Sequence, residues 1–196
     1  MLTALSAVLL VAGRSTRMGR DKALLEIEGA PLWRRQHAVL AAAGAAEVFL
    51  SARPDQAWAQ RAAGFSAVLH DAVPESGPLV GITAALERAA HPHLEVLAID
   101  LPAMTAGWFA ARAAECTPGV GVVGRRGECF EPLAAIYPAE LKWLAWEALA
   151  RNDYSVQRLV AAGVERGLLR VREIGGEDAA LFANWNRAED FRPEPR

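Results

Sequence analysis

The chain has 196 residues, of which 53% are hydrophobic and 22% are charged, and its formal net charge is −2. This length suits one domain with a sizeable core. The near-neutral charge excludes a whole-protein field that would attract nucleic acid or an anionic membrane, so any phosphate site must be local. No stretch is apolar for long enough to cross a bilayer, and residues 1–11 lack the basic start and cleavage site of an export signal. We therefore expect a cytoplasmic protein without nucleic-acid or membrane partners.

We expect a single domain over residues 1–191 and a flexible tail over residues 192–196, where two prolines stand close together. The two cysteines, Cys116 and Cys129, have no zinc-type pairing and no His-rich tract beside them, which predicts reduced thiols without a metal.

The most informative stretch is residues 7–22, Ala-Val-Leu-Leu-Val-Ala-Gly-Arg-Ser-Thr-Arg-Met-Gly-Arg-Asp-Lys. Its first part is an apolar run typical of a strand buried on both faces. From Ala12 onward small, hydroxyl and charged residues follow, which suits a loop whose backbone amides face an anion while cations close over it. A plain solvated turn is the alternative for a Gly-rich turn alone. Arg17, Asp21 and Lys22 in the same tract favour a triphosphate site.

Strands and helices alternate along the chain. The expected strands are residues 7–11, 46–51, 67–69, 94–99, 119–123, 130–137 and 168–174, with a turn at 124–127. The expected helices are residues 32–43, ended by Gly44; 54–62; 79–90; 105–114; 138–150; and 155–162, capped by Ser155 and stopped by Gly163. This order predicts an α/β fold: a doubly wound, mostly parallel sheet sandwiched by helices in three layers.

Ligands of such sheets bind outside the carboxyl ends of the strands, which singles out Gly13, Arg53, Asp71 and Asp100. After Asp71, residues 75–82 form a loop that enters a helix and could present backbone donors to a base or ribose. An ordinary turn and helix entry explain the same spacing equally well. Asp100 is a natural oxygen ligand for Mg²⁺, and its alternative role is the cap of a helix beginning near Thr105.

The first loop resembles the nucleotidyltransferase signature Leu-Ala-(Gly or Ala)-Gly-x-(Ser or Gly)-x-Arg-Met. It is most similar to the molybdenum cofactor guanylyltransferases, whose version continues Gly-x-Asp-Lys. The matching residues are Leu10, Ala12, Gly13, Ser15, Arg17, Met18, Gly19, Asp21 and Lys22. The resemblance implies a Rossmann-like nucleotidyltransferase fold. It also implies Mg²⁺-dependent transfer of GMP from GTP to the phosphate of molybdopterin or molybdenum cofactor, with release of pyrophosphate. Molybdoenzymes or their chaperones would be the protein partners.

The resemblance also implies roles for individual residues. The catalytic set would be Arg17, Lys22 and Asp100, with Asp100 as the Mg²⁺ ligand. The nucleotide-binding set would be Leu10, Val11, Ala12, Gly13, Arg14, Ser15, Lys22, Asp71, Gly77, Pro78, Leu79 and Asp100. The acceptor would contact Glu131 and Pro132 from a Pro-Leu-x-Ala-x-Tyr strand, and Asn184 and Asn186 from the final Asn-x-Asn-x-x-Glu-Asp segment.

Three positions leave alternatives open. Val11 stands where the family usually has Ala, and Ala12 at its place is more familiar in cytidylyl and uridylyl relatives. Ala52 stands where the family often has Asn. A related enzyme using CTP, or a sugar phosphate as acceptor, is therefore the first alternative, and a non-catalytic nucleotide-binding partner of molybdoenzymes is the second. A dinucleotide oxidoreductase ranks last, because the first turn lacks Gly-x-Gly-x-x-Gly and no acidic residue directly follows residues 46–51.

Overall fold

The computed structural model describes residues 4–13, 21–70 and 77–185. The strands are β1 (Leu5–Leu10), β2 (Glu26–Ile27), β3 (Ala30–Pro31), β4 (Ala45–Ala52), β5 (Ala67–His70), β6 (His93–Ala98), β7 (Gly121–Arg126), β8 (Cys129–Pro138) and β9 (Leu169–Glu173). The α-helices are α1 (Leu32–Ala43), α2 (Pro78–Arg88), α3 (Ala106–Glu115), α4 (Leu141–Ala150) and α5 (Val156–Glu165). Short 3-10 helices are η1 (Lys22–Leu24), η2 (Ala59–Arg61) and η3 (Gly176–Phe182).

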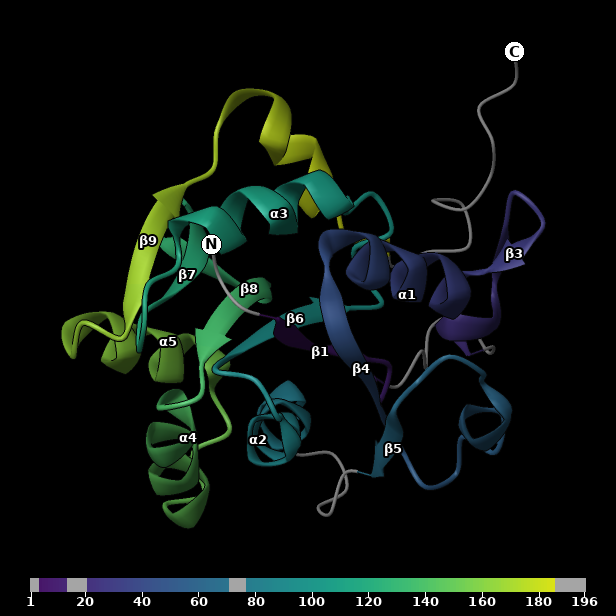
Figure 1. Cartoon of the computed structure of the whole chain (residues 1–196), viewed down its shortest axis with the longest axis horizontal. Helices are drawn as coiled ribbons and strands as arrows, with labels where there is room; N and C mark the ends of the chain where they lie inside the picture. The colour runs from purple at the N-terminus through teal and green to yellow at the C-terminus, as the bar shows by residue number, and fades with distance from the viewer. Residues whose placement is uncertain (1–3, 14–20, 71–76, 186–196) are drawn as a thin grey trace.

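Seven strands form one mixed sheet in the order β5-β4-β1-β6-β8-β7-β9, and β2 pairs with β3 in a separate hairpin. Within the described sheet β8 alone runs antiparallel to its neighbours. Helices α1 and α3 cover one face, and α2, α4 and α5 cover the other (Figure 1). The predicted three-layer α/β fold with a mostly parallel sheet is confirmed.

Local sequence signals explain several element ends. Gly44 ends α1 in the left-handed conformation, with φ 105°, as glycine allows without strain. The hydroxyls of Thr105 and Ser155 accept hydrogen bonds from Trp108 N and Arg158 N, which caps α3 and α5. Because Thr105 itself caps α3, Asp100 is not needed as that cap.

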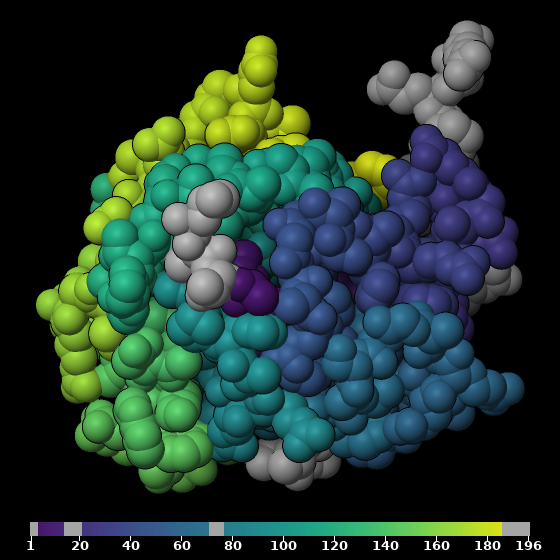
Figure 2. Space-filling model, viewed as in Figure 1, coloured from purple at the N-terminus to yellow at the C-terminus, as the bar shows by residue number. Residues whose placement is uncertain are grey.

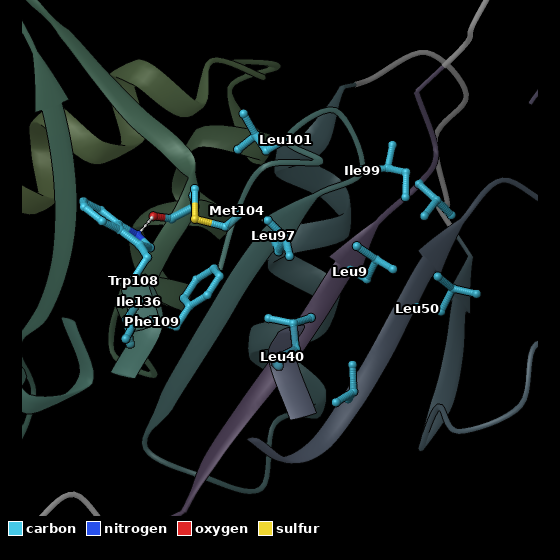
Figure 3. Packing of buried hydrophobic residues seen from close by; sticks show 14 of the residues in the cluster. Leu9, Leu40, Leu50, Leu97, Ile99, Leu101, Met104, Trp108, Phe109 and Ile136 are labelled. Carbon is cyan, nitrogen blue, oxygen red and sulfur yellow. Dashed lines mark hydrogen bonds between the residues drawn. The ribbon is translucent and has the colours of Figure 1, made fainter. Parts of the chain in front are cut away.

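The core lies in two layers, one on each side of the central strands. Leu9 and Leu97 of neighbouring strands pack with Leu40 of α1 and Phe109 of α3 (Figure 3). Trp108 is anchored there, because its Nε1 donates to the carbonyl oxygen of Ala134 at 3.1 Å (Figure 3).

The 3-10 helix η3 covers α3 from outside the sandwich (Figures 1 and 2). Phe182 of η3 packs against Trp108 in a T-shaped arrangement, with ring centroids 4.9 Å apart. This contact brings the end of the described chain back over the layer formed by α1 and α3.

Two helix predictions are wrong. Residues 54–62 form successive turns and the short η2 instead of a helix, and their side chains bond the first loop, as described below. Gly163 does not stop α5, which continues to Glu165. A Cβ at Gly163 would lie 2.9 Å from Leu169 Cδ1 and 3.0 Å from Leu141 Cδ1, so close packing favours glycine there. The turn at 124–127 is also shorter than expected, because β7 extends through Arg126.

Among the helices in the described part of the chain, none is both long enough and apolar enough to cross a membrane. The two cysteines are free, Cys116 buried and Cys129 exposed. Burial raises the pKa of the Cys116 thiol to about 12, and the negative charges of Glu115 and Glu95 add to the shift.

One carboxyl group is buried in the middle of the sheet. Glu95 of β6 pairs with Ala7 on one side and Ile136 on the other, and it is fully buried. Neither carboxyl oxygen has a hydrogen-bond partner within the described residues. Burial raises the pKa of Glu95 to about 8, because the charged form would lose its hydration without gaining a partner. Glu95 is therefore protonated at neutral pH.

Replacing Glu95 by Gln tests this protonation state. The unfolded chain releases the proton near its ordinary pKa of 4.5, whereas the folded chain holds it up to about 8. Between these values the wild type should lose about 1.4 kcal/mol of unfolding free energy per pH unit relative to Glu95→Gln. Urea unfolding of both proteins at several pH values in this window measures the difference. Parallel stability curves would show that Glu95 is already ionised in the folded protein.

Candidate active site

The site is built where β1 and β6 end side by side. Ile99 N donates to Leu10 O at 3.1 Å, which places the next residue, Asp100, beside the end of β1. Lys22 opens η1 after the first loop, and its Nζ lies 2.8 Å from Asp100 Oδ1. The Lys22 side chain is 7% exposed and that of Asp100 is 45% exposed. A sheltered cation thus meets a carboxylate that remains open to solvent, at the carboxyl edge of the sheet.

The segment around Asp100 is held by backbone bonds from distant parts of the chain. Trp185 N donates to Asp100 O at 3.2 Å, and Gln36 Nε2 of α1 donates to Leu101 O at 2.6 Å. Gln36 is buried, so its bond is shielded from competing water. These contacts fix the strand end that carries the carboxylate.

The start of the first loop passes from core to surface within four residues. Leu10 and Val11 are buried, Ala12 is partly exposed and Gly13 is exposed. Val11 N donates to Ser51 O of β4 at 2.9 Å, and Leu10 O is occupied by Ile99 N. Leu10 and Val11 therefore form the base of the site, and Ala12 and Gly13 form its accessible part.

Segment 53–58, which follows β4, binds both ends of this loop. Arg53 Nη1 donates to Ala12 O at 2.8 Å and Gly13 O at 3.0 Å. Gln56 Nε2 donates to Val11 O at 3.1 Å and to Asp21 Oδ2 at 2.8 Å. These two residues connect residues 11–13 to Asp21.

Trp58 completes the contacts at the far end of the loop. Its Nε1 donates to Asp21 Oδ2 at 2.7 Å, and the other carboxylate oxygen of Asp21 accepts from Ala23 N at 3.1 Å and so caps η1. Sequence reasoning placed Arg53 at a strand end but did not find its contacts, and it missed Gln56 and Trp58. The wrongly predicted helix over 54–62 hid the latter two, and no local signal identifies a side chain that bonds to a distant loop.

Helix α2 begins next to the same strand ends. Gly77 precedes it with φ 75°, Pro78 is its first residue and Leu79 is buried. A Cβ on Gly81, the fourth residue of the helix, would lie 3.1 Å from Ser51 Cβ and 3.2 Å from Leu10 Cδ2, so α2 packs closely on β4 and β1. The amides of the first turn of α2, which have no partner within the helix, therefore lie at the edge that carries Ala12 and Gly13.

Two of the residues predicted to contact the acceptor, Glu131 and Pro132, lie at the same edge. Ala134 of β8 pairs with Leu97 of β6, so Glu131 and Pro132 stand near the end of β6. Glu131 is bonded to Arg126 at 2.8 Å, yet desolvation outweighs that cation and raises the pKa of Glu131.

Hydrogen bonds and ion pairs define the surroundings of Pro132, Asn184 and Arg125. Pro132 O accepts from the buried Tyr137 hydroxyl at 2.6 Å. Asn184 is exposed and precedes Trp185, whose N–H binds Asp100 O. Arg125, near the end of β7, is paired with Glu173 of β9.

Several predicted site residues lie outside the described part of the chain: Arg14, Ser15, Arg17, Met18, Gly19, Asp71 and Asn186.

The donor set limits how a metal could be held. Within the described residues no group of three or more His, Cys, Asp or Glu side chains could enclose a metal ion. Asp100 Oδ1 is bonded to Lys22, while Oδ2 has no protein partner among the described residues. One open carboxylate, completed by water and substrate phosphates, is the coordination that Mg²⁺ commonly accepts in phosphate-transferring enzymes. Asp100 therefore fits a divalent ion bound together with a nucleotide.

Comparison with known proteins places this geometry in a family. The family model described as the MobA-like NTP transferase domain matches residues 7–169. A relative from Opitutus terrae named probable molybdenum cofactor guanylyltransferase is 42% identical, and the match covers 99% of this chain and 96% of the relative.

Solved structures agree on the fold. A nucleotidyl transfer enzyme from Methanothermobacter has a TM-score of 0.77 at 19% identity, covering 96% of this chain and 94% of that one. A Mycobacterium tuberculosis H37Rv protein in complex with manganese has a TM-score of 0.59 at 18% identity, covering 89% of this chain and 90% of that one. Because the family model spans most of the sequence, the chain belongs to the MobA-like NTP transferase family and is a nucleotidyltransferase.

Proposed function

We infer that the protein transfers GMP from GTP to the phosphate of molybdopterin or molybdenum cofactor, giving the guanine dinucleotide and pyrophosphate. The observation that carries this conclusion is the Lys22–Asp100 contact of 2.8 Å at the joined ends of β1 and β6. The relative that is 42% identical over nearly the whole chain supports guanine as the base and molybdenum cofactor as the acceptor.

The reaction requires positioning and charge neutralisation more than acid–base chemistry. An α-phosphorus is attacked in line by the acceptor phosphate while pyrophosphate leaves, so negative charge gathers around one centre. A phosphate monoester is already largely ionised at neutral pH, since its second pKa is about 6. No general base is required, and none of the described His residues lies among the contacts of Lys22 and Asp100.

Different residues of the chain would position the substrates and neutralise their charge. In the proposal, the amides of Ala12 and Gly13 and of the residues after them hold the triphosphate, and Arg17 binds its outer phosphates as a two-pronged donor. Lys22 lies near the α-phosphate or the acceptor phosphate as a compact charge. Val11 and Leu10 form the base of this site, and Arg14 and Ser15 are further loop contacts. Asp71 and residues 77–79 are the proposed contacts for the base and ribose.

Asp100 is the proposed metal ligand. A Mg²⁺ ion bound there would neutralise charge on the phosphate oxygens and polarise the phosphorus. Lys22, bonded to Oδ1, would keep the carboxylate oriented so that Oδ2 remains available. The manganese-bound structural neighbour shows that a protein of this fold takes a divalent ion.

The acceptor side is proposed to include Glu131, Pro132, Asn184 and Asn186. Molybdoenzymes or their chaperones are the proposed recipients of the product, and the cytoplasm is the proposed site of action. CTP as donor, or a sugar phosphate as acceptor, is the nearest alternative, favoured by Ala12 and Ala52.

A direct assay decides between these functions. We expect purified protein with Mg²⁺, molybdopterin and GTP to form a guanine dinucleotide and pyrophosphate, and ATP, CTP and UTP to give much less product. Mass spectrometry of the product identifies the base. A cytidine product, or a product only with a sugar phosphate, would replace the assignment. GTP binding without pyrophosphate release would indicate a non-catalytic nucleotide-binding protein.

Replacing Lys22 by Met removes the charge and keeps the apolar stem. We expect about a 100-fold or larger loss of pyrophosphate release, because the developing phosphate charge loses a preorganised donor. Lys142→Met on α4, over the Trp143 ring, is the matched control and should leave turnover unchanged. Unchanged turnover of Lys22→Met, with normal thermal melting, would exclude Lys22 from catalysis.

Replacing Asp100 by Asn removes one charge from an exposed carboxylate that lies beside Lys22. We expect both a large loss of turnover and a higher Mg²⁺ concentration for half-maximal activity, because an amide is a poor Mg²⁺ ligand. Asp178→Asn in η3 is the control, since Asp178 is exposed on the outer helix. A variant at Asp100 with the wild-type Mg²⁺ dependence would mean that the metal is held elsewhere.

A further inference from the structure

Three consecutive carbonyl groups at the start of the first loop are bonded to side chains of one segment. Gln56 Nε2 binds Val11 O at 3.1 Å, and Arg53 Nη1 binds Ala12 O and Gly13 O at 2.8 and 3.0 Å. Gln56 is buried, and the Arg53 side chain is 22% exposed. The loop carbonyls are therefore turned toward segment 53–56.

Peptide geometry then fixes the direction of the neighbouring N–H groups. All described peptide bonds are trans, and in a trans peptide the C=O of one residue and the N–H of the next point in opposite directions. With Val11 O and Ala12 O facing Gln56 and Arg53, the N–H groups of Ala12 and Gly13 face the other way. Neither N–H is bonded to another described residue. Two adjacent donors are thus displayed on one side of the loop.

The bonding groups are themselves held in place. Gln56 Oε1 accepts from Arg53 N at 2.8 Å, and Arg53 Nε is paired with Asp55 Oδ1 at 2.9 Å. The second hydrogen of Gln56 Nε2 goes to Asp21 Oδ2 at 2.8 Å, so one amide group bonds both ends of the loop. The charge of Arg53 is directed at carbonyl oxygens and at Asp55 instead of at an open site.

We propose that Arg53 and Gln56 are positioning residues that turn the N–H groups of Ala12 and Gly13 toward the phosphate chain of the donor nucleotide. They act through the backbone and do not contact the nucleotide. This inference rests on the proposed function, because it takes the ligand of the loop to be a nucleoside triphosphate. It predicts that losing Arg53 weakens the binding of phosphates and spares the binding of the base and sugar.

Arg53→Met tests this separation, with tripolyphosphate and guanosine as the two probes in NMR titrations. In Arg53→Met the N–H groups of Ala12 and Gly13 would no longer be held toward the phosphates. The Kd for tripolyphosphate should therefore rise about tenfold or more, while the Kd for guanosine changes less than about twofold. Arg61→Met in η2 is the matched control: it removes the same charge from an exposed position and should leave both constants within about twofold. Arg53→Lys keeps the charge but lacks the planar guanidinium, whose Nε binds Asp55 while Nη1 binds both carbonyl oxygens. The Kd of Arg53→Lys for tripolyphosphate should therefore lie between those of Arg53→Met and the wild type.

The outcomes separate the two claims. If the wild type binds no tripolyphosphate and releases no pyrophosphate, the proposed function fails. If the wild type binds tripolyphosphate and Arg53→Met binds it equally well, the positioning role is wrong and the proposed function stands. The same holds if Arg53→Met loses affinity for guanosine as much as for tripolyphosphate. If Arg53→Met does not melt cooperatively, the test rests on Arg53→Lys. A Kd of Arg53→Lys for tripolyphosphate equal to that of the wild type would then overturn the inference. Full rescue by Lys would indicate a direct charge effect on phosphate.

Discussion

The structure of the site depends on one ion pair between residues that are far apart in sequence. Lys22 follows the first loop and Asp100 follows β6, and their side chains meet because β1 and β6 are adjacent parallel strands. Parallel neighbours end at the same edge, so whatever follows each strand is brought together there. A cation and a carboxylate at this edge can serve phosphate and metal at the same time, and nucleotidyl transfer needs both.

The rest of the fold holds this edge in place. The α1 residue Gln36 and the late residue Trp185 bind the backbone beside Asp100, while Arg53 and Gln56 bind the backbone of the first loop. These contacts come from α1, from the segment that follows β4 and from the segment that follows η3. A preorganised site of this kind places its donors before the substrate arrives, so less reorganisation is required during the reaction.

The sequence predicts most of the fold because its signals are local. The apolar run of β1, Gly44 at the end of α1 and the Ser155 cap follow from periodicity and capping chemistry. Asp100 could be placed at a strand end from the same kind of pattern, whereas Lys22 was assigned to the site by its place in the family motif. The contacts of Gln56 could not be predicted, because they depend on three-dimensional packing that overrides the local preference for a helix over 54–62. Glu95 was likewise hidden, since a protonated carboxyl inside an apolar strand leaves no pattern distinct from that strand.

The most direct test of the central claim is a crystal structure with Mn²⁺ and a non-hydrolysable GTP analogue, in which anomalous scattering locates the metal. The account predicts a manganese peak coordinated by Asp100, with the phosphates between Lys22 and the N–H groups of Ala12 and Gly13. A manganese peak and a phosphate chain bound away from the ends of β1 and β6 would contradict it.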